Sequence, residues 1–240
     1  MLHAEPCRGA AADRRVVPVT RRIVVTPAVA GELVGTAVLT TAVVGSGIMA
    51  ERLAGGNAAV ALLANTIATG AALAVLIAVL GPVSGAHLNP VVSVASAWWS
   101  TIDAGQAAAR AMVQVLGAAL GVGVAHAMYG LPLVQAGTTV RSDPGLWISE
   151  FVATCGLVTV VRLCPRALAA PVVSLYIVSA YWFTASTSFA NPALTIARSL
   201  TSTFTGIRPV DTVAFIGAQA AGAIAGVLLA AWLSRDEVAA

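Results

Sequence analysis

The chain has 240 residues, of which 58% are apolar and only 10% are charged. Soluble domains carry roughly 25% charged residues, so this chain has too few polar side chains to cover a soluble surface. The net charge of +3 comes from 13 arginines without a single lysine. Most of these arginines lie near the chain ends or in loops, which disfavours nucleic-acid binding. The composition therefore predicts an integral membrane protein.

The first 22 residues differ from the rest of the chain. They contain five arginines and lack the apolar core and the small-residue cleavage site of a secretory signal. We expect residues 1–22 to form a disordered cytoplasmic tail, followed by a membrane domain over residues 23–240.

Six segments are apolar and long enough to cross a membrane. About 20 helical residues span a hydrocarbon core roughly 30 Å thick, and the strict alternation of a barrel strand is missing. The segments cover residues 27–50, 58–80, 107–129, 145–164, 171–185 and 210–233. Two further apolar segments, 89–99 and 191–201, are too short to cross alone.

Both short segments begin with Asn followed by Pro, in Asn89-Pro90-Val91 and Asn191-Pro192-Ala193. Asn is a favourable helix N-cap, and Pro is tolerated at the first helical position. Each segment is therefore predicted to be a half-helix. Broken backbone at membrane depth is tolerated only where it lines a polar cavity, so the pair indicates a transport path.

The two halves of the chain repeat. Glu32 in the first span corresponds to Glu150 in the fourth, and Gln114-x-x-Gly117-x-x-x-Gly121 corresponds to Gln219-x-x-Gly222-x-x-x-Gly226. Repeat one covers about 23–130 and repeat two about 143–235. Because three spans per half is an odd number, the second half enters the membrane from the opposite side, as an inverted repeat. The fold class is therefore an all-α membrane protein with six transmembrane helices and two re-entrant half-helices.

The arginine distribution predicts the orientation, because cytoplasmic loops carry an excess of Lys and Arg. With both termini inside, nine arginines are cytoplasmic and four are outside. The cytoplasmic set is Arg8, Arg14, Arg15, Arg21, Arg22, Arg110, Arg162, Arg166 and Arg235; the outer set is Arg52, Arg141, Arg198 and Arg208. We therefore expect a multi-pass protein of a bacterial inner membrane with cytoplasmic termini.

An inverted repeat brings the two half-helix N-termini together near the membrane midplane. Each N-terminus carries about +0.5 charge and unpaired N–H groups. The pair forms a positive barrier that disfavours cations and protons, while the Asn89 and Asn191 amides donate to passing oxygen atoms. Small neutral hydroxylated solutes are the expected cargo.

The segments Ser84-Gly85-Ala86-His87-Leu88-Asn89-Pro90-Val91 and Ser188-Phe189-Ala190-Asn191-Pro192-Ala193 resemble the paired signature loops of the aquaporin (major intrinsic protein) family. The resemblance covers nearly everything after residue 22. It implies the aquaporin fold, one pore per subunit, a homotetramer, and neither a cofactor nor a metal. Val91 stands where the family has Ala, and we expect it to add bulk beside Asn89.

The buried polar residues are interpreted as structural. A carboxylate inside a span costs roughly 2.5–3.5 kcal/mol on insertion scales, so Glu32 and Glu150 should face the bundle interior. The resemblance implies that they hold the re-entrant loops, with Gln114 and Gln219 in a similar role; a proton relay is the alternative. His87 either lines the inner pore mouth or packs within its loop.

By the resemblance, four positions form the outer constriction: Thr69, Ser179, Ser188 and Leu194. Water-selective members of the family carry an aromatic residue at the first, His at the second and Arg at the fourth, and none is present here. This predicts a wide ring of three hydroxyls opposite one apolar wall. Arg198, one helical turn beyond Leu194, either supplies the missing positive charge in the outer vestibule or extends to the membrane interface.

The segments 65–70 and 191–198 resemble a bacterial branch associated with arsenic resistance, within the aquaglyceroporin-like members. Tyr181, Trp182 and Phe183 are interpreted as part of an interfacial aromatic belt; the alternative, if the alignment is shifted, is that these rings narrow the pore mouth. The predicted function is a passive channel for trivalent arsenic or antimony hydroxides, glycerol-like polyols and water. The alternatives are a water-selective aquaporin and a proton-coupled secondary transporter. An enzyme is disfavoured because the spans offer no nucleophile–base pair and no metal cluster.

Overall fold

The computed structural model describes residues 26–235, so the predicted tail over residues 1–22 lies outside the described residues. Within them there are eight α-helices and no β-strand, and six of the helices are long and apolar enough to span a membrane. The helices are α1 Pro27–Leu53, α2 Ala58–Ser84, α3 Pro90–Trp98, α4 Ala104–Met128, α5 Pro144–Leu163, α6 Ala169–Phe183, α7 Pro192–Arg198 and α8 Thr212–Leu233. The predicted fold class is confirmed.

Local chemistry at the helix starts explains these boundaries. The Asn57 side chain accepts hydrogen bonds from the backbone N–H groups of the first turn of α2. Asp103 and Gln106 form a reciprocal capping box at the start of α4. Pro27 and Pro144 occupy the first positions of α1 and α5, where the missing N–H leaves no unpaired donor.

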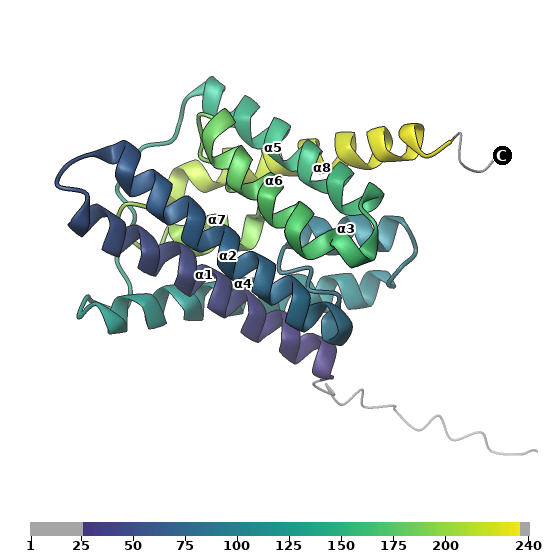
Figure 1. Ribbon diagram of the computed structural model, residues 1–240, viewed down its shortest axis with the longest axis horizontal. Helices are drawn as coiled ribbons and strands as arrows, with labels where there is room; N and C mark the ends of the chain where they lie inside the picture. The colour runs from purple at the N-terminus through teal and green to yellow at the C-terminus, as the bar shows by residue number, and fades with distance from the viewer. Residues whose placement is uncertain (1–25, 236–240) are drawn as a thin grey trace, which may run out of the picture.

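The long helices run along one axis of the molecule, and the beginning of α1 and the end of α8 lie at the same end (Figure 1). We call this end the terminal face and the other end the opposite face. Successive spans alternate in direction, so α2 and α5 end, and α4 and α6 begin, at the terminal face. The chain halves thus have the opposed orientations that an inverted repeat requires.

Each repeat is held together internally by one helix pair, α1 with α4 in the first repeat and α5 with α8 in the second. A Cβ at Gly117 of α4 would collide with the carbonyl oxygen of Leu33 in α1, and a Cβ at Gly222 of α8 would collide with that of Phe151 in α5. Gly121 and Gly226 make equally close approaches one turn further along. The repeated Gly-x-x-x-Gly spacing therefore permits near-contact of the backbones, as small residues do in membrane bundles.

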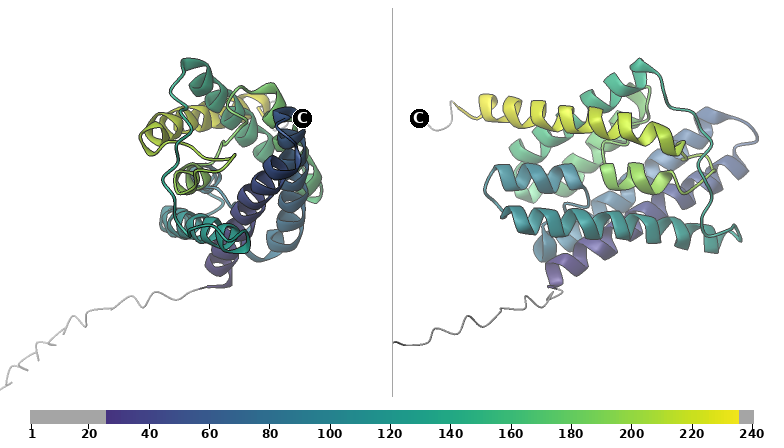
Figure 2. Two further views of the ribbon diagram at one scale, coloured as in Figure 1. Left: turned by 90° about the vertical axis from the view of Figure 1, so that its left-hand side faces the viewer. Right: turned by 180° about the vertical axis from the view of Figure 1, so that it is seen from behind.

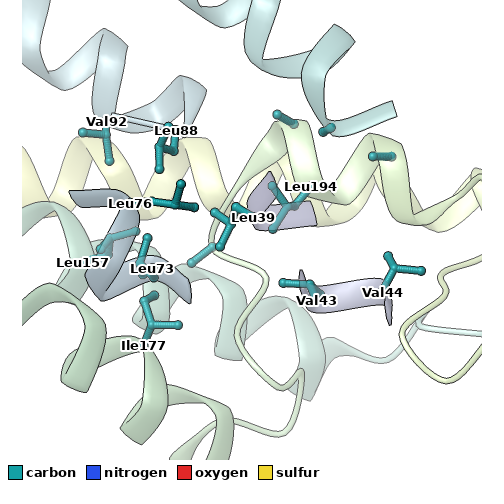
Figure 3. Packing of buried hydrophobic residues seen from close by; sticks show 14 of the residues in the cluster. Leu39, Val43, Val44, Leu73, Leu76, Leu88, Val92, Leu157, Ile177 and Leu194 are labelled. Atoms are coloured by element: carbon teal, nitrogen blue, oxygen red, sulfur yellow. The ribbon is translucent and has the colours of Figure 1, made fainter. Parts of the chain in front are cut away.

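The two half-helices α3 and α7 lie between these pairs, and their N-terminal ends meet in the interior. Seen from behind in Figure 2, they lie between α4 and α8. Buried apolar side chains from both repeats surround them, including Leu39 of α1, Leu73 of α2, Leu157 of α5 and Leu194 of α7 (Figure 3). The core therefore joins the two repeats across the region where the half-helices meet.

Candidate functional site

A cavity of about 850 Å³ runs through the bundle. Its lining begins at the terminal face with Arg162 and Arg166, passes both Asn89 and Asn191, and reaches Arg198 of α7. Both repeats contribute to its wall, and within residues 26–235 the lining contains no Asp or Glu side chain. The cavity therefore has the length and the polarity of a path across the membrane for uncharged solutes.

Asn89 and Asn191 are related by an approximate two-fold axis at the centre of this path. The Asn89 amide donates to the carbonyl oxygen of Ala190 at 2.8 Å, and the Asn191 amide donates to that of Leu88 at 2.8 Å. Each Asn oxygen meanwhile caps its own half-helix, Oδ1 of Asn89 accepting from Val91 N at 3.1 Å and Oδ1 of Asn191 from Ala193 N at 3.0 Å. An amide carries two N–H donors, so one donor of each Asn is available to the cavity.

Glu32 holds the first re-entrant loop from inside α1. Its carboxylate accepts from the backbone N–H of His87 at 2.9 Å and of Leu88 at 2.7 Å. The Gln114 amide donates to the same carboxylate at 2.8 Å and to Ser93 Oγ at 3.0 Å. Glu32 and Gln114 are fully buried and lie outside the cavity lining.

Glu150 repeats this arrangement in the second half. Its oxygens accept from Phe189 N and Ala190 N, each at 2.8 Å. The Gln219 amide donates to Glu150 at 2.6 Å and to Thr195 Oγ1 at 2.8 Å. Each carboxylate therefore accepts two loop backbone N–H groups and one glutamine amide, which is the arrangement expected of loop supports, and neither carboxylate belongs to the cavity lining.

The loops need this support because their backbone is strained. Ala86, Leu88, Ser188 and Ala190 have φ between 45° and 51°, a left-handed conformation that costs a non-glycine residue about 1–2 kcal/mol. The strained pairs occupy equivalent positions in the two repeats. Strain of this kind persists where surrounding contacts fix the backbone, and the Glu32 and Glu150 contacts do so here.

At the end of the cavity nearest the opposite face, Thr69, Ser188 and Leu194 line the wall as expected, but Ser179 does not. Ser179 is exposed on the outside of α6, where its hydroxyl donates to the Tyr176 carbonyl oxygen at 2.7 Å. Its placement in the constriction is therefore corrected.

Tyr181, two residues further along α6, lies on the cavity wall instead. It is only 5% exposed, lines the cavity, and its hydroxyl lies 3.5 Å from Thr69 Oγ1. The inward face of α6 carries three residues at positions i, i+4 and i+8, which are Val173, Ile177 and Tyr181. This helical spacing was the sequence signal that could have placed Tyr181 on the cavity wall. The interpretation of Tyr181 as a belt residue is wrong, whereas Trp182 and Phe183 are exposed.

Arg198 lies at the end of the cavity nearest the opposite face. The side chain is 3% exposed, its Nε donates to the Thr205 carbonyl oxygen, and its Cζ lies 3.3 Å from the centroid of the Phe189 ring. Among residues 26–235 its two Nη groups have no hydrogen-bond partner. The arginine therefore does not extend to the membrane interface, and it presents donors to the path one turn beyond Leu194.

A second arginine, Arg141 in the loop between α4 and α5, contacts the same Phe189 ring but does not line the cavity. Its Cζ lies 4.9 Å from the Phe189 ring centroid, and its side chain donates to the carbonyl oxygens of Gly206 at 3.1 Å and Ser186 at 3.3 Å. Burial lowers the pKa of the Arg141 guanidinium from its ordinary value. Two cations thus converge on one aromatic ring, an arrangement that no local sequence pattern could indicate.

His87 lines the cavity on its terminal side, in the loop between α2 and α3. Its Nδ1 lies 3.1 Å from Ser93 Oγ, and Arg110 Nη1 lies 3.4 Å from its ring nitrogens. Arg110 also donates to the Ser84 carbonyl oxygen at 2.6 Å. Burial, the largest effect, together with the Arg110 charge lowers the pKa of His87 to about 4, although Glu32 acts in the other direction.

The remaining motif residues support the half-helices without lining the path. Pro90 and Pro192 occupy the first helical positions of α3 and α7. Val91 is 7% exposed and, with Pro90 and Pro192, faces a separate groove on the outside of the bundle. The bulk that Val91 adds next to Asn89 therefore lies away from the path. Ala193 is fully buried.

Comparisons with known proteins agree with this geometry. The sequence model described as major intrinsic protein matches residues 20–167. The chain is 49% identical over 178 residues to a protein named aquaglyceroporin AqpS from Rhizobium meliloti (strain 1021), with 73% of this chain and 76% of that protein covered. The X-ray structure of the aquaglyceroporin from Plasmodium falciparum superimposes with a TM-score of 0.65 at 22% identity, covering 87% of this chain and 95% of that one. The chain therefore belongs to the major intrinsic protein family of membrane channels.

Proposed function

We propose that this chain is a passive channel that conducts small neutral polyhydroxy solutes, namely glycerol-like polyols and the neutral hydroxides of trivalent arsenic and antimony. The observation that carries the proposal is the wall between Asn191 and Arg198. There three residues with hydroxyl groups, Thr69, Tyr181 and Ser188, line one cavity with the apolar side chain of Leu194. A polyol presents hydroxyls on one side and carbon on the other, so it can exchange its water contacts for such a wall. The relative named aquaglyceroporin agrees with this class of solute.

The arrangement of carboxylates supports a passive mechanism. A proton-coupled transporter needs a titrating group that faces the pathway. Glu32 and Glu150 are fully buried and are occupied by the re-entrant loops, and the described cavity lining is free of carboxylates. The positive ends of α3 and α7 and the Arg198 guanidinium disfavour protons and other cations along the path.

A water-selective channel is the second candidate, and one observation favours it. Tyr181 and Arg198 bring an aromatic ring and a guanidinium to the outer part of the cavity, although the sequence positions expected to hold such groups carry other residues. The constriction is therefore narrower than one formed by three small hydroxyl side chains and a leucine. The two candidate functions differ in the size of the solute that can pass the constriction, and solute fluxes measure this difference directly.

The test uses the purified full-length protein in liposomes. Stopped-flow shrinkage in sorbitol measures water flux, and glycerol uptake and arsenite entry measure solute flux. We expect solute flux well above that of empty liposomes, independent of an imposed proton gradient. Leu194→Arg should reduce polyol and arsenite flux more than water flux, because it adds bulk and charge to the wall. Fast water flux without solute flux would support the water channel, and uptake that collapses with the proton gradient would refute the passive mechanism.

We also propose the membrane, the orientation and the oligomeric state of the channel. The proposed membrane is a bacterial inner membrane; the arginine distribution supports cytoplasmic termini, and membership of the family supports a homotetramer. Accessibility of single introduced cysteines to a membrane-impermeant reagent would test the orientation. Light scattering of the purified protein would test the oligomeric state.

A further inference from the structure

A second hollow lies on the outside of the bundle, between α3 and α8. This α3–α8 groove has a volume of about 340 Å³ and only apolar or aromatic lining residues. They are Pro90, Val91, Val94, Ala95, Trp98, Pro192, Ala220, Ala223, Ile224, Val227 and Leu228. Val94 is 61% exposed and Trp98 73% exposed, so the groove opens to the surroundings.

The groove spans one leaflet. Its inner end lies at Pro90 and Pro192, where the two half-helices meet at mid-membrane. Its outer end lies at Trp98, the last residue of α3, at the terminal face. The eight steps along the helix from Pro90 to Trp98 rise about 12 Å at 1.5 Å per residue, and one leaflet contributes about half of the roughly 30 Å hydrocarbon core.

A cation lies next to the end of the groove at the terminal face, although it belongs to the lining of the pore cavity and not to that of the groove. Trp99 packs with Ala95 and Val227, which belong to the floor of the groove, and the Arg162 Cζ lies 5.2 Å from its ring centroid. Aromatic rings and arginines at this depth lie where phospholipid headgroups begin. An apolar groove about one leaflet long, with an exposed guanidinium separated from its headgroup end by the Trp99 ring, matches the two parts of a phospholipid.

We propose that the α3–α8 groove binds one acyl chain of a phospholipid from the leaflet at the terminal face, with the lipid phosphate near Arg162. Water cannot form hydrogen bonds with the apolar wall of the groove, and an empty groove would leave each lining side chain without dispersion contacts on one side. The chain end reaches Pro90 and Pro192, so the lipid supports the half-helix junction from the side opposite the pore. This binding is independent of which solute the pore conducts.

The test uses the full-length protein in liposomes containing phosphatidylglycerol whose acyl chain carries a terminal diazirine. After irradiation, mass spectrometry of peptides locates the label. We expect label concentrated on α3 and on the groove-lining residues of α8. Ala223→Phe, which fills the groove, should reduce it about fivefold, the factor that corresponds to roughly 1 kcal/mol. Ala221→Phe is the matched control, because Ala221 is exposed on the same helix outside the groove.

Val94→Trp fills the groove from the exposed side of α3 and needs no repacking, so it provides a second variant if Ala223→Phe does not fold. Arg162→Gln should weaken labelling by about fivefold, because one arginine near anionic lipid contributes about 1 kcal/mol. Label spread evenly over all outward-facing helices, or unchanged in both filling variants, would overturn the proposal. Crosslinks between α3 and α8 of two copies of the chain would assign the groove to a subunit contact instead.

Discussion

Replacement of Glu150 by Gln tests whether the second re-entrant loop depends on its buried carboxylate. The carboxylate accepts three hydrogen bonds, from Phe189 N and Ala190 N at 2.8 Å and from the Gln219 amide at 2.6 Å. A glutamine side chain has one oxygen and one NH2 group. If its oxygen retains Ala190 and Gln219, its NH2 group faces the Phe189 N–H, and both donors lack an acceptor.

The magnitude follows from these two groups. Each unsatisfied buried donor costs about 1–3 kcal/mol, so Glu150→Gln should destabilise the protein by roughly 2–6 kcal/mol. For a chain of this length 1 kcal/mol shifts Tm by about 2–4 °C, so the expected fall in Tm is roughly 4–24 °C. Solute flux should fall as well, because the Ala190 carbonyl that receives the Asn89 amide belongs to the loosened loop.

Thermal unfolding in detergent and flux in liposomes measure the two effects. Glu51→Gln is the matched control, because Glu51 is exposed near the end of α1 and its replacement should leave Tm unchanged. Glu32→Gln should reproduce the loss, because Glu32 accepts the equivalent three hydrogen bonds. A Glu150→Gln protein as stable as the Glu51→Gln protein would refute the role assigned to the carboxylate.

Three further predictions concern the pore and the packing. Tyr181→Ala should increase polyol flux relative to water flux in liposomes, whereas Ser179→Ala should change neither, and equal effects of the two would contradict the corrected constriction. Gly117→Ala should lower Tm, because overpacking costs about 1–3 kcal/mol. Gly123→Ala, where the added Cβ meets nothing within 4 Å, should raise Tm slightly, since Ala is favoured over Gly in helices by about 1 kcal/mol. Because the pKa of His87 is lowered to about 4, the His87 side chain is neutral at neutral pH, and solute flux should be constant from about pH 8 to 5.5. A step in flux near the ordinary His pKa of about 6.5 that disappears in His87→Ala would refute this prediction.

Much of the fold could be predicted because its signals are local. Apolar length identifies the spans, and Asn-Pro identifies the half-helices through capping chemistry. The repeated Glu and Gln-x-x-Gly positions identify the inverted symmetry. All of these depend on residues a few positions apart, or on order along the chain.

The constriction could not be predicted in the same way. Ser179 and Tyr181 are two residues apart on one helix, so they point about 200° apart, and counting back from Asn191 cannot resolve the phase of α6. The structure turns Tyr181 inward and Ser179 outward. The stacking of Arg141 and Arg198 on Phe189 joins three segments that no sequence pattern links.

The sequence by itself thus determined that this chain spans a membrane six times, with two helix starts facing one another at mid-depth, because apolar length and N-cap chemistry are properties of single segments. The tertiary structure alone decided which side chains form the wall of the path. The rotation of α6, the course of the loop carrying Arg141 and the depth of Arg198 depend on how separate helices pack, and packing is set by contacts between residues far apart in the chain.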